Sequence, residues 1–230
     1  MPTYENDFIC LPEQQEYQQA EDLAASLRCQ GLEIGNTSII SNIPRICFTK
    51  IRDSEGYALD PTLSTLDRQR FNGAISIGEQ CFIESHSDRP PFHSQCMKLT
   101  CVQTNDNPPG KIMIGNRVHM AGTAIVSYRH VEIGDNVGIG PMVTIMDCDG
   151  HTTKGRGNDT EMARLSAQPV KIGSGTGIGA GAWIMKGVTI GKNCMIGANS
   201  VVVGDIPDNC VAFGNPARVV QRLKEEEIFA

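Results

Sequence analysis

The stretch that decides the fold runs from Ile172 to Pro207 and reads IGSGTGIGAGAWIMKGVTIGKNCMIGANSVVVGDIP. Every sixth residue is aliphatic, in the series Ile172, Ile178, Ile184, Ile190, Ile196 and Val202. The position that follows is mostly glycine. A period of six fits neither the stripe of a helix nor the alternation of a simple strand. It is typical of a solenoid whose short strands each send one aliphatic side chain into a narrow interior.

The same period returns earlier in the chain. Hexads begin at Ile114, Met120 and Val126, and again at Ile133, Ile139 and Ile145. Three hexads make one coil of about 18 residues, so we expect triangular coils stacked about 4.8 Å apart. Weaker fragments begin at Ile34 and Ile77. We therefore predict an all-β solenoid over residues 32–216.

Three segments interrupt the period, and we predict insertions at residues 44–73, 86–111 and 151–171. Proline and glycine punctuate all three, as is typical of surface loops in repeat proteins. The third insertion is polar and interrupts the more regular half of the repeat. Long loops of this kind are usually functional, so we expect a projecting functional loop near 151–171.

The two ends of the chain differ from the repeat. Residues 12–29 predict a helix, with Pro12 in its first turn and Gly31 after its end. We expect residues 1–31 to form a helical cap on the open end of the solenoid. Residues 217–230 predict a short C-terminal helix.

Composition limits the possible partners and location. The net charge of −6 argues against a broad basic surface for nucleic acid. No stretch approaches the roughly 20 apolar residues of a membrane span, so we expect no membrane insertion. The nine cysteines form no CxxC pair, and the N-terminus carries no export signal. These features predict reduced thiols and a cytoplasmic protein.

Three motifs accompany the repeat: Ile133-Gly134-Asp135-Asn136, Val188-Thr189-Ile190-Gly191 and the ending Gly214-Asn215-Pro216-Ala217-Arg218-Val219. With these motifs, roughly residues 112–222 resemble the hexapeptide-repeat acyltransferases. The ending resembles the branch that contains the maltose and galactoside O-acetyltransferases and many acetyltransferases of surface-polysaccharide sugars. This resemblance implies a left-handed parallel β-helix and a homotrimer. It also implies an active site between subunits, acetyl-CoA as cosubstrate and a histidine on a projecting loop.

The resemblance places that histidine at His151, in Asp147-Cys148-Asp149-Gly150-His151. A neutral imidazole suits the removal of a proton from the acceptor, so His151 is the expected general base. Asp147 or Asp149 is expected to orient the ring, although both acids equally suit a turn. Cys148 beside the base suggests a Cys–His nucleophile, but the family transfers the acetyl group directly.

On the acceptor side, His119, Ser127 and His130 are the expected contacts. His130 stands at an interior-type position of its hexad, which equally suggests a buried structural histidine. The maltose and galactoside enzymes carry an acid where this chain has Ser127 or Tyr128, which argues against a simple galactoside acceptor. The three histidines at 119, 130 and 151 do not have the spacing of the γ-class carbonic anhydrase, so we predict no metal.

On the donor side, the resemblance places Ala180 and Ala198 against the arm of CoA, with a backbone N–H near Ala180 as an oxyanion donor. Both alanines are equally explained by tight turns. Arg218 and Arg222 are expected to bind the nucleotide phosphates.

The sequence thus predicts a cytoplasmic, acetyl-CoA-dependent O-acetyltransferase for a sugar of a cell-surface polysaccharide or its precursor. One alternative is N-acetylation of a nucleotide-linked amino sugar, since an amine also loses a proton. A second alternative is a non-catalytic trimeric β-helix scaffold.

Overall fold

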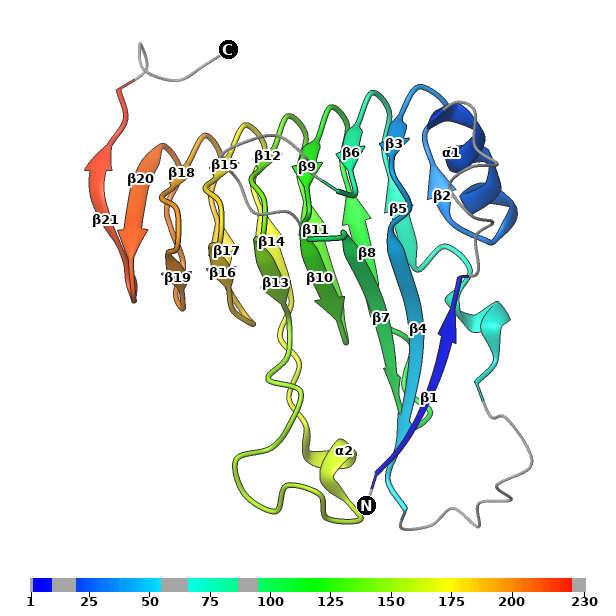
Figure 1. Cartoon of the computed structure of the whole chain (residues 1–230). Helices are drawn as coiled ribbons and strands as arrows, with labels where there is room; N and C mark the ends of the chain where they lie inside the picture. The colour runs from blue at the N-terminus through cyan, green and yellow to red at the C-terminus, as the bar shows by residue number, and fades with distance from the viewer. Residues whose placement is uncertain (1, 10–19, 55–65, 87–94, 225–230) are drawn as a thin grey trace.

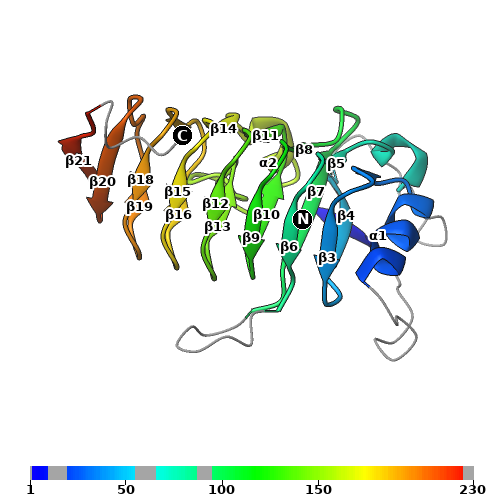
Figure 2. The same ribbon diagram turned by 90° about the horizontal axis from the view of Figure 1, so that it is seen from above.

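The computed structural model describes residues 2–9, 20–54, 66–86 and 95–224, which wind into a parallel β-solenoid with three sides. The coils stack along one axis, from α1 (Ala20–Cys29) at one end to β21 (Ala217–Arg222) at the other (Figures 1 and 2). Each side is one sheet. The neighbouring strands of a sheet are parallel, except that β1 pairs antiparallel with β4 and β20 with β21.

The three sheets have seven, six and eight strands and are named A, B and C. Sheet A contains β1 (Thr3–Phe8), β4 (Arg45–Arg52), β7 (Lys98–Thr104), β10 (Ala124–Ser127), β13 (Thr144–Met146), β16 (Trp183–Ile184) and β19 (Val201–Val202). Sheet B contains β2 (Glu33–Ile34), β5 (Ile75–Ile77), β8 (Lys111–Ile114), β11 (His130–Ile133), β14 (Val170–Ile172) and β17 (Thr189–Ile190). Sheet C contains β3 (Ile39–Ser41), β6 (Phe82–Glu84), β9 (His119–Ala121), β12 (Gly138–Ile139), β15 (Gly177–Ile178), β18 (Met195–Ile196), β20 (Cys210–Gly214) and β21.

Each sheet sends buried aliphatic side chains into the interior in rows that run from coil to coil. The strand register aligns Ile77, Ile114, Ile133, Ile172 and Ile190 in sheet B. Full burial of one such side chain contributes about 1.5–3 kcal/mol. The regular half therefore has the three-hexad coil that the sequence predicts.

Glycine follows the aliphatic residue because successive coils approach closely at the corner. A Cβ built on Gly173 would lie only 2.5 Å from the carbonyl carbon of Gly191 in the next coil. Gly175 has a φ of 73°, and Asn136 and Asn193 adopt the same left-handed conformation at the equivalent corner of the neighbouring coils. Glycine and asparagine are the residues that tolerate this conformation best.

Two of the expected insertions contain strands of the solenoid. β4 lies within 44–73 and β7 within 86–111, and the two pair in parallel from Arg45–Lys98 to Ile51–Thr104. Residues 55–65 and 87–94 of these segments lie outside the described residues. The hexad predicted to begin at Val126 was also wrong by one residue. Ile125 is the buried residue of β10, whereas Val126 points outward.

The ends of the described chain agree in part with expectation. α1 packs Leu23, Ala24 and Leu27 against the first coil, as a cap would, whereas residues 12–19 lie outside the described part. The expected C-terminal helix is wrong for Ala217–Arg222, which form strand β21 because their backbone pairs with β20. None of the described helices is long and apolar enough to span a membrane.

The third break is a loop that projects from the solenoid between β13 and β14 (Figure 1). An antiparallel bridge between Cys148 and Ala167 closes its base. The loop carries the short helix α2 (Glu161–Arg164), whose Met162 packs against Ile51 and Val102 of sheet A. The loop is therefore fixed at its tip as well as at its base.

Candidate active site

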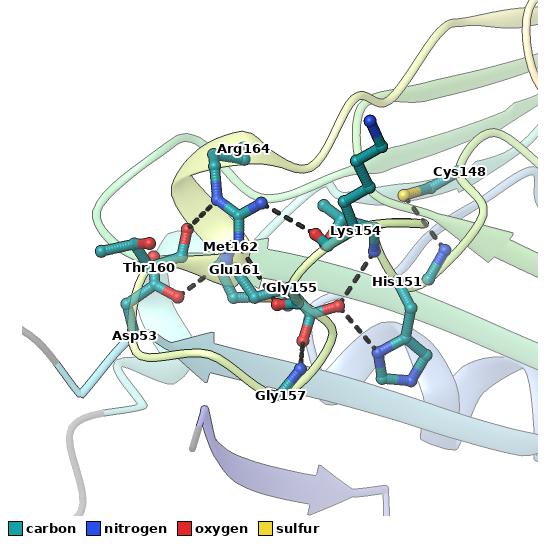
Figure 3. A network of polar contacts seen from close by, with 12 residues as sticks. Asp53, Cys148, His151, Lys154, Gly155, Gly157, Thr160, Glu161, Met162 and Arg164 are labelled. Atoms are coloured by element: carbon teal, nitrogen blue, oxygen red, sulfur yellow. Dashed lines mark hydrogen bonds and ion pairs between the residues drawn. The ribbon is translucent and has the colours of Figure 1, made fainter.

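His151 lies just beyond the closed base of the projecting loop, and its side chain is 38% exposed. Its Nδ1 lies 3.1 Å from Oε1 of Glu161 (Figure 3). The ring is therefore both accessible and held by a carboxylate.

Glu161 is the first residue of α2, and its carboxylate is fully buried. It accepts hydrogen bonds from the backbone N–H of Thr152 at 2.9 Å and of Gly157 at 2.6 Å. Buried carboxylates persist only when donors satisfy them, and these two amides together with His151 do so. The loop between His151 and α2 is thus folded around the Glu161 side chain.

This environment fixes the protonation state of Glu161. The hydrogen bond from Gly157, followed by those from Thr152 and His151, lowers the pKa of Glu161 from its ordinary value near 4.5 to about 2, despite its burial. An ionised carboxylate can only accept, so the Nδ1 of a neutral His151 carries the proton. Nε2 is then the basic nitrogen of the ring.

The two acids expected to orient the ring have other partners. Asp147 is buried and accepts from the Ser127 hydroxyl and from the backbone N–H groups of Tyr128, Arg129 and His130. Asp149 is exposed and pairs with Lys186. The orienting carboxylate was therefore predicted wrongly, because Asp147 closes the preceding corner of the coil and Asp149 lies on the surface.

Cys148 does not suit a nucleophile. Its side chain is buried, and burial raises the pKa of the thiol above its ordinary value. The Gly150 N–H donates to its sulfur at 3.4 Å. A neutral buried thiol is a poor nucleophile, so the geometry favours direct transfer.

The expected acceptor contacts are dispersed. Ser127 is buried, and its hydroxyl lies 2.9 Å from both Lys111 O and Asp147 Oδ2, so its expected substrate contact is wrong. His130 is half-buried on the outer face of sheet B, which argues against the alternative of a buried structural histidine, and it lines a hollow of about 400 Å³. His119 is exposed on sheet C, where its ring packs edge-on against Phe82.

Two tyrosines that the prediction did not select lie near the loop. The Tyr128 ring packs in a cluster with Met162, and its hydroxyl lies 3.9 Å from the position of a Cβ built on Gly150. Tyr4 of β1 is half-exposed. Burial raises the pKa of Tyr4, and the nearby Glu161 carboxylate raises it further. Both phenols therefore lie on the His151 side of sheet A.

Ala180 and Ala198 occupy one corner, between sheets C and A, in successive coils. The Asn199 N–H donates to Ala180 O at 2.9 Å, and a Cβ on Gly179 would lie 2.5 Å from the Ala198 nitrogen. Among the described residues, neither alanine N–H has an acceptor. His151 leaves a different corner, between sheets A and B, so one chain does not bring the imidazole and the two alanines to the same edge.

The two arginines lie further along the solenoid. Arg218 and Arg222 are exposed on β21, and Arg218 Nη1 donates to the Ala217 carbonyl. Within the described ranges, no group of three or more His, Cys, Asp or Glu residues has a geometry that would hold a metal ion.

Comparison with known proteins agrees with this architecture. Residues 169–204 match the family described as bacterial transferase hexapeptide (six repeats). The chain is 35% identical over 173 residues to the galactoside O-acetyltransferase of Escherichia coli strain K12, covering 70% of this chain and 83% of that enzyme.

Solved structures also resemble the fold. A maltose O-acetyltransferase from Clostridium difficile has a TM-score of 0.51 and 26% identity, over 93% of this chain and 80% of that one. A hexapeptide-repeat acetyltransferase from Vibrio cholerae, in complex with acetyl coenzyme A, also has a TM-score of 0.51 and 26% identity. The match covers 69% of this chain and 75% of that one. The chain therefore belongs to the hexapeptide-repeat transferase family, and it is an acyltransferase.

Proposed function

We propose that this enzyme transfers the acetyl group of acetyl-CoA to a hydroxyl of a sugar in a cell-surface polysaccharide or its precursor, with His151 as general base. One observation carries the proposal: Nδ1 of His151 is held at 3.1 Å by a buried, ionised carboxylate, which leaves Nε2 basic. General base catalysis by such a ring contributes about 10²–10⁴ in rate.

The transfer needs no acyl-enzyme. Nε2 takes the proton of the acceptor hydroxyl while the acceptor oxygen bonds to the acetyl carbon. The carbon–sulfur bond then breaks, and the proton on His151 passes to the leaving thiolate. Glu161 keeps its charge throughout and stabilises the imidazolium that forms.

Acetyl-CoA supplies the activated acetyl group as a thioester. The corner at Ala180 and Ala198 fits its thin, amide-rich arm, because the side chains there are small and two backbone N–H groups have no acceptor among the described residues. The Ala180 N–H is also the proposed oxyanion donor. Arg218 and Arg222 would bind the phosphates by charge-assisted hydrogen bonds.

The separation of the two corners supports a site shared between copies. A homotrimer of left-handed solenoids, as in the family, would bring the loop of one copy to the alanine corner of its neighbour. Tyr128, Tyr4 and His130 would face the acceptor. We place this activity in the cytoplasm, where the eight free cysteines of the described residues would stay reduced.

The test uses purified enzyme, acetyl-CoA and a panel of nucleotide sugars and lipid-linked oligosaccharides, with release of free CoA thiol as the readout. The proposal expects an acetylated sugar whose acetyl group is removed by mild alkali, as an ester is. An alkali-stable product would establish N-acetylation instead. No thiol release, with no rise in melting temperature on adding acetyl-CoA, would indicate a scaffold.

A further inference from the structure

Asp53 contacts the projecting loop from the N-terminal half of the chain. It lies just after β4 and is only 3% exposed. Its carboxylate accepts from the backbone N–H of Met162 at 2.7 Å (Figure 3). It also accepts from the backbone N–H of Ala163 at 2.8 Å. Both amides belong to the first turn of α2. The N–H groups there have no partner within the helix and need an acceptor from outside it.

The helix lacks its own cap. Thr160 is the N-cap residue of α2, but its side chain makes no capping hydrogen bond. A carboxylate that accepts backbone N–H groups makes charge-assisted hydrogen bonds, which are stronger than neutral ones. Asp53, which follows a strand distant in sequence, therefore does what a local capping side chain usually does.

Asp53 is itself held in place. Asn105 Nδ2 donates to its carboxylate at 3.0 Å, and the Asp53 N–H donates to Asn105 Oδ1 at 2.9 Å. Met162, the residue that donates to Asp53, packs against Ile51 on the same strand. Polar and apolar contacts thus fix the first turn of α2 on the end of β4.

The same turn begins with Glu161. Its backbone is continuous with the two amides that Asp53 binds, and its side chain reaches His151 Nδ1. A shift of α2 would therefore move the carboxylate that orients the imidazole. Asp53 is linked to the base through one turn of helix, although it touches neither the base nor a substrate.

We propose that Asp53 is a positioning residue of this enzyme: by capping α2 it sets the place of Glu161 and thereby the orientation of the His151 ring. The proposal rests on the proposed function, in which His151 is the base. It assigns a catalytic purpose to the segment around β4, which lies outside the regular hexads.

The primary test compares Asp53→Ala with Asp67→Ala as a matched control. Asp67 also caps a short helix, η2 (Arg68–Phe71), where its carboxylate accepts from Gln69 N at 3.0 Å. Asp53→Ala is expected to lower kcat by about 10-fold or more and leave the KM for acetyl-CoA within about 2-fold, because only the base is misplaced. Asp67→Ala is expected to leave both constants unchanged.

A double-mutant cycle separates positioning from general damage. In a Glu161→Gln background, Asp53→Ala is expected to lower kcat by less than about 2-fold, because the effect passes through Glu161. If the fold-losses in kcat of the two single variants multiply in the double variant, the proposal is overturned. A normal kcat in Asp53→Ala also overturns it. If Asp53→Ala does not fold, Asp53→Asn serves in the same cycle, since its amide group can accept at only one atom.

Hydrogen exchange distinguishes this proposal from the proposed function. The amides of Met162 and Ala163 should exchange at least about 10-fold faster in Asp53→Ala and at the wild-type rate in Asp67→Ala. Normal turnover of His151→Ala would refute the base, and with it the positioning role. A different result would refute the positioning role alone. In that result His151→Ala loses turnover, while Asp53→Ala keeps the wild-type turnover and the wild-type amide exchange rates.

Discussion

Nδ1 of His151 lies 3.1 Å from the buried Glu161 carboxylate, ten residues further along the same loop. The contact holds the ring, selects its tautomer and supplies a fixed negative charge next to it. A half-exposed histidine on a polar loop would ordinarily be a solvated side chain. The carboxylate instead holds the ring in the tautomer that the proposed role as general base requires.

Replacement of Glu161 by glutamine tests this relationship. The amide carries no charge. Its NH2 group would also face one of the N–H donors whose hydrogen bonds the wild-type carboxylate accepts. We expect kcat to fall by about 10- to 100-fold, less than on removal of the base itself. Steady-state kinetics checks this. Glu79→Gln is the control, because Glu79 also accepts from a backbone N–H, that of Thr37, at a different corner of the solenoid. Equal kinetics in the two variants would contradict the role of Glu161.

The same carboxylate predicts a pH dependence of stability. Because folding lowers the pKa of Glu161 from near 4.5 to about 2, its ionised form stabilises the folded state at every pH above about 4.5. That contribution is lost as the pH falls from about 4.5 to about 2. The difference in melting temperature between wild type and Glu161→Gln should therefore shrink over this range. A difference that stays constant down to pH about 2 would contradict the lowered pKa.

Asp147 should act on stability and not on the ring. Asparagine replaces one of the two carboxylate oxygens by an NH2 group, which cannot accept. Some of the present donors, which are the Ser127 hydroxyl and the N–H groups of residues 128–130, then lose their acceptor. We expect a loss of about 2–4 kcal/mol in the free energy of unfolding. Thermal denaturation measures it, with Asp149→Asn as the exposed control, expected within about 1 kcal/mol of wild type. A stable Asp147→Asn enzyme with lost turnover would restore the orienting role.

The interior row of sheet B gives a test of the fold. Ile190 is fully buried, whereas Thr189, its neighbour on β17, is exposed. Ile190→Asp would bury an unpaired carboxylate and should cost at least about 3 kcal/mol. Thr189→Asp should change stability by less than about 1 kcal/mol. Similar melting temperatures for the two variants would contradict the inward direction of Ile190.

The regular half of the solenoid was predictable because its signal is local. Each hexad of 172–207 carries its own aliphatic residue, and the corners require glycine or asparagine. The segments at β4 and β7 lack that signal. Their strands are long, and β4 also pairs antiparallel with β1, so the stretch Arg45–Arg52 does not follow the six-residue period. Ala217–Arg222 suit either a helix or a strand, and pairing with β20 decides between them.

The resemblance to the family singles out His151 as the expected base, but nothing in the sequence singles out its partner Glu161. An acid in a polar loop is ordinarily exposed. Glu161 is buried in the structure, where the next residue, Met162, packs on sheet A and donates its N–H to Asp53. That contact joins segments 109 residues apart, and no local pattern reports it.

The measurement that tests the central claim most directly is the turnover of His151→Ala beside that of Thr153→Ala, an exposed substitution in the same loop. We predict that kcat of His151→Ala falls by about 10²-fold or more, while acetyl-CoA binds with unchanged affinity and Thr153→Ala keeps wild-type turnover. Near-normal turnover of His151→Ala would contradict the assignment of the base.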